Sequence, residues 1–345
     1  MDDVAKLPAA DRDDLFRASA AKRAFSTVIV EKDFWVCWTL KRLFSLSDPP
    51  AGLIFKGGTS LSKVWGVIDR FSEDVDLSFN RSDLGFGGAA DPAAAGSTKK
   101  RNRQLELLSS ACTAMMRDKL LPRLDDAFIA ALRVPSGTAW RLEIDPDDAQ
   151  SILFHYPTTA PSGPSDEAAY LRRFIKLEMG ARSEHWPSED AVVRPFAAQD
   201  FPNAFSSAES HVKVVSAERT FWEKVTILHS WYHAEQSRPL RDRQSRHYFD
   251  VYKLYQSPIG ARALADLGLL RSVAQHKSVF FASAWARYDE AVPGTLRLVP
   301  PDFRLPELER DYAQMRSEMI FGAAPDLHEL LDVLGQIEQE INRQP

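Results

Sequence analysis

Two short motifs carry the residues of this chain that could do chemistry. The first is a glycine-rich turn after the apolar run at residues 53–55, and it consists of Gly57, Gly58, Thr59 and Ser60. Paired glycines allow a tight turn and a close approach of the backbone to a ligand. Thr59 or Ser60 is expected to cap a helix, whose first-turn N–H groups would then bind a phosphate. The turn therefore predicts a phosphate cradle between a strand and a helix.

The second motif is a strand, residues 74–79, that carries two carboxylates. Successive side chains of a strand point to opposite faces, so Asp74 and Asp76 share one face and the apolar residues share the other, which is expected in the core. Two adjacent carboxylates repel each other unless a cation lies between them, and oxygen ligands beside phosphate favour Mg²⁺ over zinc. The two motifs, fifteen residues apart, indicate metal-dependent nucleotidyl transfer. The alternative is a capping turn followed by a solvated strand edge.

Later strands offer a third carboxylate. In residues 140–145, Glu143 and Asp145 lie opposite the apolar face, and in residues 174–179 Glu178 does the same. The alternation leaves open which of the three is a metal ligand and which are ordinary solvent-facing charges.

Helical patterns surround these strands. Residues 7–47 are expected to be helical, and Glu31, Lys32 and Asp33 precede a wide apolar arc, where a charged first turn would complement the helix dipole. Near residues 196–210 the composition turns to Pro, Ser, Ala and Asn, and helical stripes dominate afterwards. We therefore predict an α+β fold: a core with a mixed sheet at residues 1–205 and an all-helical C-terminal domain at residues 206–345.

Two residues of the predicted C-terminal domain stand out. Lys224 shares the apolar side of its helix with Phe221 and Leu228, where a lysine either meets an anion or extends to solvent. Asp250 lies beside Arg246 and His247, which favours a surface ion pair.

The charge and the cysteine content limit which partners and which cellular compartment are expected. The formal net charge of −5 argues against a uniformly basic nucleic-acid binder, so RNA contacts would need local clusters, such as those at residues 99–103 and 238–246. The two cysteines, Cys37 and Cys112, are far apart among apolar residues and predict buried thiols. Because the chain has no run of eighteen apolar residues and an acidic start, we expect a cytoplasmic protein without a membrane segment.

The motifs resemble those of the AbiEii toxin family of type IV toxin–antitoxin systems, within the DNA polymerase β-like nucleotidyltransferase superfamily and related to the MenT toxins. Its Gly-Gly-Thr-x-Leu motif stands at residues 57–61, and its Arg-Phe-Ser-x-Asp-x-Asp-Leu motif stands at residues 70–77. Further resemblance runs through residues 30–33, 218–228, 246–254 and 319–322. The fourth motif is typically Asp-x-x-Asp-Leu, and this chain departs from it by having His247 at the first position.

This resemblance implies a nucleotidyltransferase whose site lies between the two halves. It assigns Asp74 and Asp76 to Mg²⁺, favours Glu178 as third ligand, places Lys224 on the nucleotide phosphates and keeps Asp250 as an acceptor-orienting or deprotonating residue. It further implies a toxin that transfers a nucleotide from an NTP to RNA, with tRNA as the expected acceptor, and that is neutralised by a cognate antitoxin. Two other interpretations stay open: a protein or small-molecule acceptor, and a nucleotide-binding module without turnover.

Overall fold

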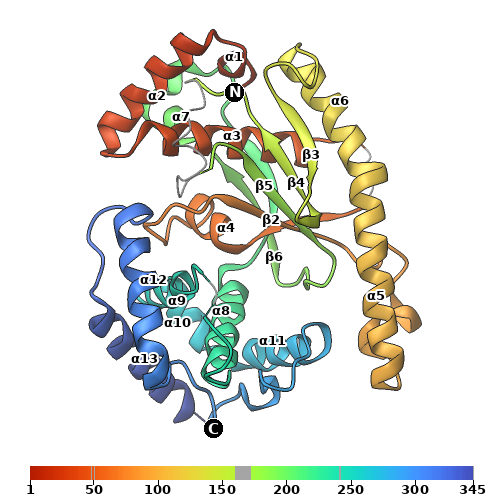
Figure 1. Cartoon of the computed structure of the whole chain (residues 1–345), viewed down its shortest axis with the longest axis vertical. Helices are drawn as coiled ribbons and strands as arrows, with labels where there is room; N and C mark the ends of the chain where they lie inside the picture. Colours follow the sequence, from red (N-terminus) through yellow and green to blue (C-terminus); the bar gives the residue numbers. More distant parts are fainter. Residues whose placement is uncertain (48, 50, 160–171, 241, 345) are drawn as a thin grey trace. The chain divides into compact units, whose positions relative to one another are not determined.

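The computed structural model describes residues 1–344 except residues 48, 50, 160–171 and 241 (Figure 1). The chain forms two compact units: the first contains Met1–Val64 and Ser72–Val214, and the second contains Trp65–Phe71 and Val215–Pro345. The first unit combines helices with a sheet, and the described residues of the second are helices and their connections, with one isolated bridge between Arg70 and Ile320. The predicted α+β class is confirmed. The division at residues 205 and 206 stays a prediction.

A mixed seven-stranded sheet forms the centre of the first unit, in the order β3-β4-β5-β2-β1-β7-β6. Strand β2 lies between β1, which is antiparallel to it, and β5, which is parallel to it. The strands are β1 (Leu53–Lys56), β2 (Asp74–Phe79), β3 (Arg141–Asp145), β4 (Asp148–His155), β5 (Ile175–Gly180), β6 (Ser188–Val193) and β7 (Ser210–Val215).

Helices cover this sheet. Figure 1 shows α5 and α6 as one column beside the strands, continuous through a π-helical stretch at Met116–Leu120. The column contacts β3, β4 and β5. The helices of this unit are α1 (Asp2–Ala5), α2 (Ala9–Arg23), α3 (Thr27–Phe44), α4 (Gly57–Lys63), α5 (Thr98–Met115), α6 (Leu121–Leu132) and α7 (Phe196–Asp200).

Helix α3 is largely buried, and it begins earlier in the chain than the sequence pattern predicted. The hydroxyl of Ser26 caps the helix by accepting the N–H of Ile29, so the helix begins at Thr27. Glu31, Lys32 and Asp33 therefore lie in the second turn, and all three are buried. The prediction of a charged first turn is wrong, because the apolar residues before these charges already belong to the helix.

The second unit is built from amphipathic helices. Phe221 and Val225 of α8 and Val251 of α9 are buried in its core, as the helical stripes predicted. The segment Trp65–Phe71 is tied to the same unit, because the N–H of Phe71 donates to the Met319 carbonyl at 2.8 Å and the N–H of Phe321 donates to the Asp69 carbonyl at 2.7 Å. The helices are α8 (Ala217–Tyr232), α9 (Ser245–Tyr255), α10 (Pro258–Leu264), α11 (Leu267–Phe280), α12 (Leu305–Glu318) and α13 (Leu327–Asn342).

Candidate active site

Strand β2 presents its two aspartates on one face and its apolar residues on the other. Val75, Leu77 and Phe79 are buried, whereas Asp74 and Asp76 are half-buried. The predicted division of the two faces is confirmed. Because β1 and β5 flank β2, the aspartates belong to a central strand and the alternative of a solvated strand edge does not hold.

The glycine turn fits tightly against the second aspartate. Gly57 has a φ of +79°, in the region that favours glycine. A Cβ atom at this position would lie 1.9 Å from Oδ2 and 2.7 Å from Cγ of Asp76, which is far inside van der Waals contact. Both the backbone angle and the contact therefore require glycine, and the turn and the carboxylate form one surface.

Helix α4 begins directly after β1, with Lys56 as its N-cap. The prediction that Thr59 or Ser60 caps this helix is wrong, because both residues lie inside the first turn. The Thr59 hydroxyl donates to the backbone carbonyl of Asp74, and the Ser60 hydroxyl donates to the carbonyl of Gly57 at 2.8 Å. The Thr59 bond fastens α4 to the start of β2, and the Ser60 bond closes the first turn of α4 itself. Both hydroxyls are thus engaged within the protein, which leaves the backbone N–H groups of the first turn as the candidate donors to a phosphate.

Among the candidates for a third carboxylate, Glu178 has the shortest path to the aspartates. Strand β5 pairs with β2 in parallel, and Glu178 is the register partner of Asp76. Asp145 lies on β3, which β4 and β5 separate from β2. Glu143 is also on β3, and its carboxylate interacts with His155 at 2.7 Å and with Arg141 at 3.1 Å. The sheet topology thus favours Glu178.

A lysine that the sequence reasoning did not single out lies in the same row of charges. Lys176 is the register partner of Asp74, and its Nζ lies 3.1 Å from Asp145 and 3.6 Å from both Asp148 and Glu178. Burial by itself would lower the pKa of Lys176, but these carboxylates outweigh it and raise the pKa. The alternation of β5, which places Lys176 and Glu178 on one face, was the signal that could have identified it.

The chemistry of this face fits a hard divalent cation. Asp74 and Asp76 supply carboxylate oxygens from one strand face, which is the ligand type that Mg²⁺ prefers. Within the described ranges, no three His, Cys, Asp or Glu side chains converge into a metal-binding group. Mg²⁺ commonly uses one or two carboxylates and completes its coordination with water and substrate phosphates. The aspartate pair therefore fits a metal that arrives with a nucleotide.

The second unit contains a buried cluster of charges around Asp250. The carboxylate of Asp250 is fully buried and accepts two hydrogen bonds from Arg70, both at 2.7 Å. The Nζ of Lys224 lies 2.7 Å from the same carboxylate. The predicted surface ion pair of Asp250 with its helix neighbours is wrong, because α9 turns this residue inward. Arg70, the first residue of the Arg-Phe-Ser-x-Asp-x-Asp-Leu motif, donates both of these hydrogen bonds and is its main partner.

The positive charges of Arg70 and Lys224 keep the Asp250 carboxylate ionised. Burial alone would raise the pKa of Asp250, but Arg70 and Lys224 hold that pKa well below its ordinary value. For Lys224, burial lowers the pKa more than Asp250 raises it. We regard the three as an ion-paired group, because one carboxylate contacts two cations.

His247 lies one helical turn before Asp250. Burial, followed by the nearby charges of Lys224 and Arg246, lowers the pKa of His247 well below its ordinary value. The imidazole is therefore neutral at physiological pH, and it does not carry the negative charge that the family motif has at this position.

The two basic clusters lie in different units. Lys99, Lys100 and Arg103 are exposed in the first turns of α5, which Ser97 caps. In the other cluster, Arg238 lies 4.7 Å from the ring centroid of Trp285. Arg241 of this cluster lies outside the described residues.

Comparisons with known proteins bear on this site. The family model described as "Nucleotidyl transferase AbiEii toxin, Type IV TA system" matches residues 38–333. Among curated proteins, none matches the chain. A search of solved structures finds similarity to MenT4, a nucleotidyltransferase toxin from Mycobacterium tuberculosis, with 14% identity, a TM-score of 0.37, and coverage of 88% of this chain and 98% of that one. The family assignment depends on the family model, which spans most of the chain.

Proposed function

Because the chain belongs to the AbiEii family of nucleotidyltransferase toxins of type IV toxin–antitoxin systems, we propose that it transfers a nucleotide from an NTP to RNA, with tRNA as the acceptor. The family predicted from the motifs is confirmed, and with it the enzyme class. One observation supports the proposed site above all others: Asp74 and Asp76 lie side by side on a central strand, and the glycine turn contacts Asp76.

In the proposed reaction an acceptor hydroxyl attacks the α-phosphate of the NTP. A bond forms between the acceptor oxygen and the α-phosphorus, and the bond from that phosphorus to the bridging oxygen of the β-phosphate breaks. Pyrophosphate leaves with that electron pair, and the proton of the acceptor hydroxyl passes to water. The N–H groups of Gly57, Gly58 and Thr59, in the first turn of α4, would hold the leaving phosphates, and Ser60 would close that turn through its hydroxyl. Asp74 and Asp76 would hold Mg²⁺, with Glu178 as the proposed third ligand. When bound, Mg²⁺ supplies charge neutralisation of the triphosphate and activation of the attacking hydroxyl.

Lys224 and Asp250 have roles in the proposal that follow from their ion pair. Lys224 is proposed to contact the nucleotide phosphates. Asp250 is already paired with two cations and has a depressed pKa, which makes it a weak proton acceptor. Of its two expected roles, orientation is therefore better supported than deprotonation, and we propose that Asp250 acts by fixing the ammonium group of Lys224.

The proposed acceptor and partners follow from charge and family. Lys99, Lys100 and Arg103 are an exposed group of cations in a chain with a net charge of −5, and they are proposed to contact RNA phosphates. A toxin–antitoxin family implies an antitoxin protein as a partner. We also propose a cytoplasmic location, which the buried free thiols of Cys37 and Cys112 support. No helix within the described ranges is both long and apolar enough to cross a membrane.

A labelling experiment tests the proposal. The purified protein is incubated with each α-labelled NTP in turn, together with Mg²⁺ and total RNA. The labelled products are separated by size, and portions are digested with protease or with nuclease to identify the acceptor. We expect label in a nuclease-sensitive species of tRNA size. Label that resists nuclease and is removed by protease would show a protein acceptor. Nucleotide binding without any labelled product would contradict the proposed turnover.

A further inference from the structure

Three consecutive charged residues of α3 each reach a different segment of the first unit. Glu31, Lys32 and Asp33 are only 2%, 2% and 1% exposed. The carboxylate of Glu31 accepts the N–H of Thr159 at 2.7 Å. Lys32 and Asp33 reach the two nucleotide motifs instead. A charged side chain is rarely buried this deeply without a partner, and each of these has one that is distant in sequence.

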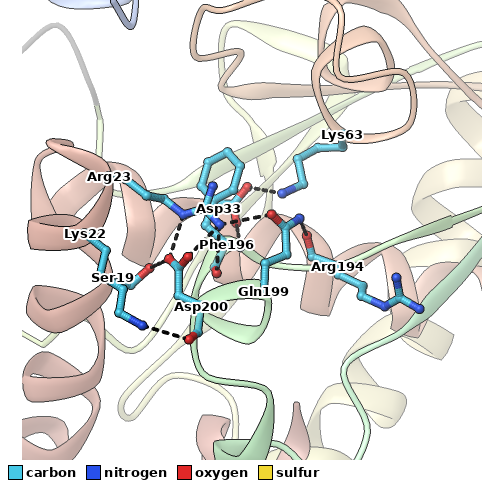
Figure 2. A network of polar contacts seen from close by, with 9 residues as sticks. All are labelled: Ser19, Lys22, Arg23, Asp33, Lys63, Arg194, Phe196, Gln199 and Asp200. Atoms are coloured by element: carbon cyan, nitrogen blue, oxygen red, sulfur yellow. Dashed lines mark hydrogen bonds and ion pairs between the residues drawn. The ribbon is translucent and has the colours of Figure 1, made fainter.

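Asp33 holds the end of the glycine-motif helix (Figure 2). Its Oδ1 accepts a hydrogen bond from Nζ of Lys63, the last residue of α4, at 2.6 Å. Its Oδ2 accepts a hydrogen bond from the backbone N–H of Phe196 at 2.6 Å. The centroid of the Phe196 ring lies 3.9 Å from Nζ of Lys63. Lys63 thus ends in a closed site formed by a carboxylate and an aromatic face.

This pair is charged at neutral pH. Burial alone would lower the pKa of Lys63, but Asp33 outweighs burial and raises it. For Asp33 itself, burial raises the pKa more than Lys63 lowers it. We regard Asp33 as a carboxylate, because both of its oxygens accept hydrogen bonds, one of them from an ammonium group.

Lys32 holds the starts of the two strands that carry the carboxylates. Its Nζ donates to Glu73, the residue directly before β2, at 3.0 Å. The same Nζ donates to the carbonyl of Arg172, shortly before β5, at 2.8 Å. Strand β2 carries Asp74 and Asp76, and strand β5 carries Glu178. One ammonium group therefore connects the entries of both strands to α3.

We propose that Lys32 and Asp33 are positioning residues of the transferase site: α3 holds the glycine helix through Lys63 and the aspartate strand through Glu73. The proposal rests on the proposed function for the reaction that is positioned. Because the Gly57 backbone packs against Asp76, a shift of α4 relative to β2 would disturb both motifs, and α3 contacts both α4 and the residue directly before β2. A displacement of about 1 Å at such a site can reduce the rate about a hundredfold.

The competing account is that these pairs only stabilise the fold. The two accounts differ when both charges of a pair are removed together. Replacing a buried ion pair by neutral groups of similar volume is often harmless to stability, because no charge is left buried alone. A purely stabilising pair would then be dispensable for the reaction, whereas a positioning pair would not, since the short directional bond that fixes α4 would be absent.

The test compares two double variants in the full-length protein. The first, Asp33→Asn with Lys63→Met, removes the charges of the proposed pair. The matched control, Arg42→Met with Asp2→Asn, removes a pair whose atoms lie 2.8 Å apart and which joins the same helix, α3, to α1. Label transfer gives kcat and the KM for NTP, and hydrogen exchange reports on the amides of residues 57–63.

We expect the first variant to lose about a hundredfold in kcat with little change in KM, and to exchange the amides of residues 57–63 faster, while the control matches the parent. Equal kcat and equal exchange in the two variants would overturn the proposal. If the first variant does not fold, Lys32→Met with Glu73→Gln applies the same comparison to β2, read at residues 74–76. If the parent itself makes no labelled product, the proposed function fails, and the exchange rates still decide whether α3 positions the motifs.

Discussion

The backbone of Gly57 lies in contact with the carboxylate of Asp76, so closely that a methyl group on Gly57 would lie 1.9 Å from Oδ2. The contact joins a turn suited to phosphate with a carboxylate suited to a metal, although nineteen positions separate residues 57 and 76 in the chain. It therefore fixes the distance between the two parts of the candidate site. A change at either residue is expected to affect both.

The first prediction is that Gly57→Ala abolishes nucleotide transfer. The new methyl group must displace the Asp76 carboxylate, and it also stands at a φ of +79°. Gly137→Ala is the matched control, because Gly137 has a φ of +82° and nothing within 4 Å of its Cβ position. Both variants should lose about 1 to 3 kcal/mol of unfolding free energy from backbone strain, but only Gly57→Ala should lose label transfer. Equal label transfer by the two variants would show that the contact between Gly57 and Asp76 is not needed for the reaction.

The second prediction concerns toxicity. If the protein is expressed without an antitoxin, we expect growth arrest, and we expect Lys224→Met to relieve it at equal soluble protein level. Removal of Lys224 leaves Asp250 with Arg70 alone, which is expected to cost up to about 3 to 5 kcal/mol of unfolding free energy. The control is Lys253→Met on α9, whose ammonium group pairs with Asp69 at 2.7 Å in a more exposed position. Arrest that persists in the Lys224 variant would remove Lys224 from the reaction.

The local geometry of the candidate site could be predicted from the sequence because it depends on neighbouring residues of one strand. The alternation of residues 74–79 is enough to place Asp74 beside Asp76, and burial confirms that placement. The partners of buried charges could not be predicted. Asp33 with Lys63 and Asp250 with Arg70 are pairs from distant parts of the sequence, and only the packing of α3 and α9 brings them together.

The pairing partners of the strands were equally hard to predict from the sequence. Strand β7 alternates buried Val212 and Val214 with exposed His211 and Lys213, yet it follows a region rich in Pro and Ser and was not identified. Its place in the sheet depends on pairing with β1, which is more than a hundred residues earlier in the chain. A local pattern of two valines does not specify such a partner.

The third prediction concerns pH. His229 is buried, its Nε2 lies 3.0 Å from the Arg287 carbonyl, and its Nδ1 accepts the N–H of Arg297 at 3.1 Å, which fits the neutral ring. Burial lowers the pKa of His229 to about 4. Between pH 6.5 and pH 4 the unfolded chain therefore binds a proton that the folded chain does not, and the free energy of unfolding should fall by about 3 kcal/mol as the pH falls.

Urea unfolding at several pH values checks this dependence. In His229→Gln the loss of stability between pH 6.5 and pH 4 should be smaller than in the parent by that amount. His211→Gln on β7 is the control, because His211 is exposed, and it should keep the parent's dependence. Identical curves for the parent and His229→Gln would show that His229 is not the responsible group.

The fourth prediction concerns RNA. If the exposed cations at the start of α5 bind phosphates, Lys99→Ala with Lys100→Ala should weaken RNA labelling. The slope of log affinity against log salt should also fall by up to about 0.9 for each RNA phosphate that the variant no longer neutralises. Binding of NTP should not change. The control is Arg117→Ala with Lys119→Ala, which removes two exposed cations from the π-helical stretch in the middle of the same helical column. Equal slopes in the two variants would exclude the α5 cluster from the RNA surface.

The central claim is that Asp74 and Asp76 carry the metal-dependent transfer, and isosteric substitution tests it most directly. Asp74→Asn and Asp76→Asn each remove one charge from half-buried positions and open no cavity in the core. Label transfer from NTP to RNA is measured for both variants and the parent over a range of Mg²⁺ concentrations, with circular dichroism to compare the folds. We predict native spectra and transfer reduced at least about a thousandfold in each variant, in line with the several kcal/mol that such metal ions supply to charge stabilisation. Transfer at the parent's rate in either folded variant would contradict the account.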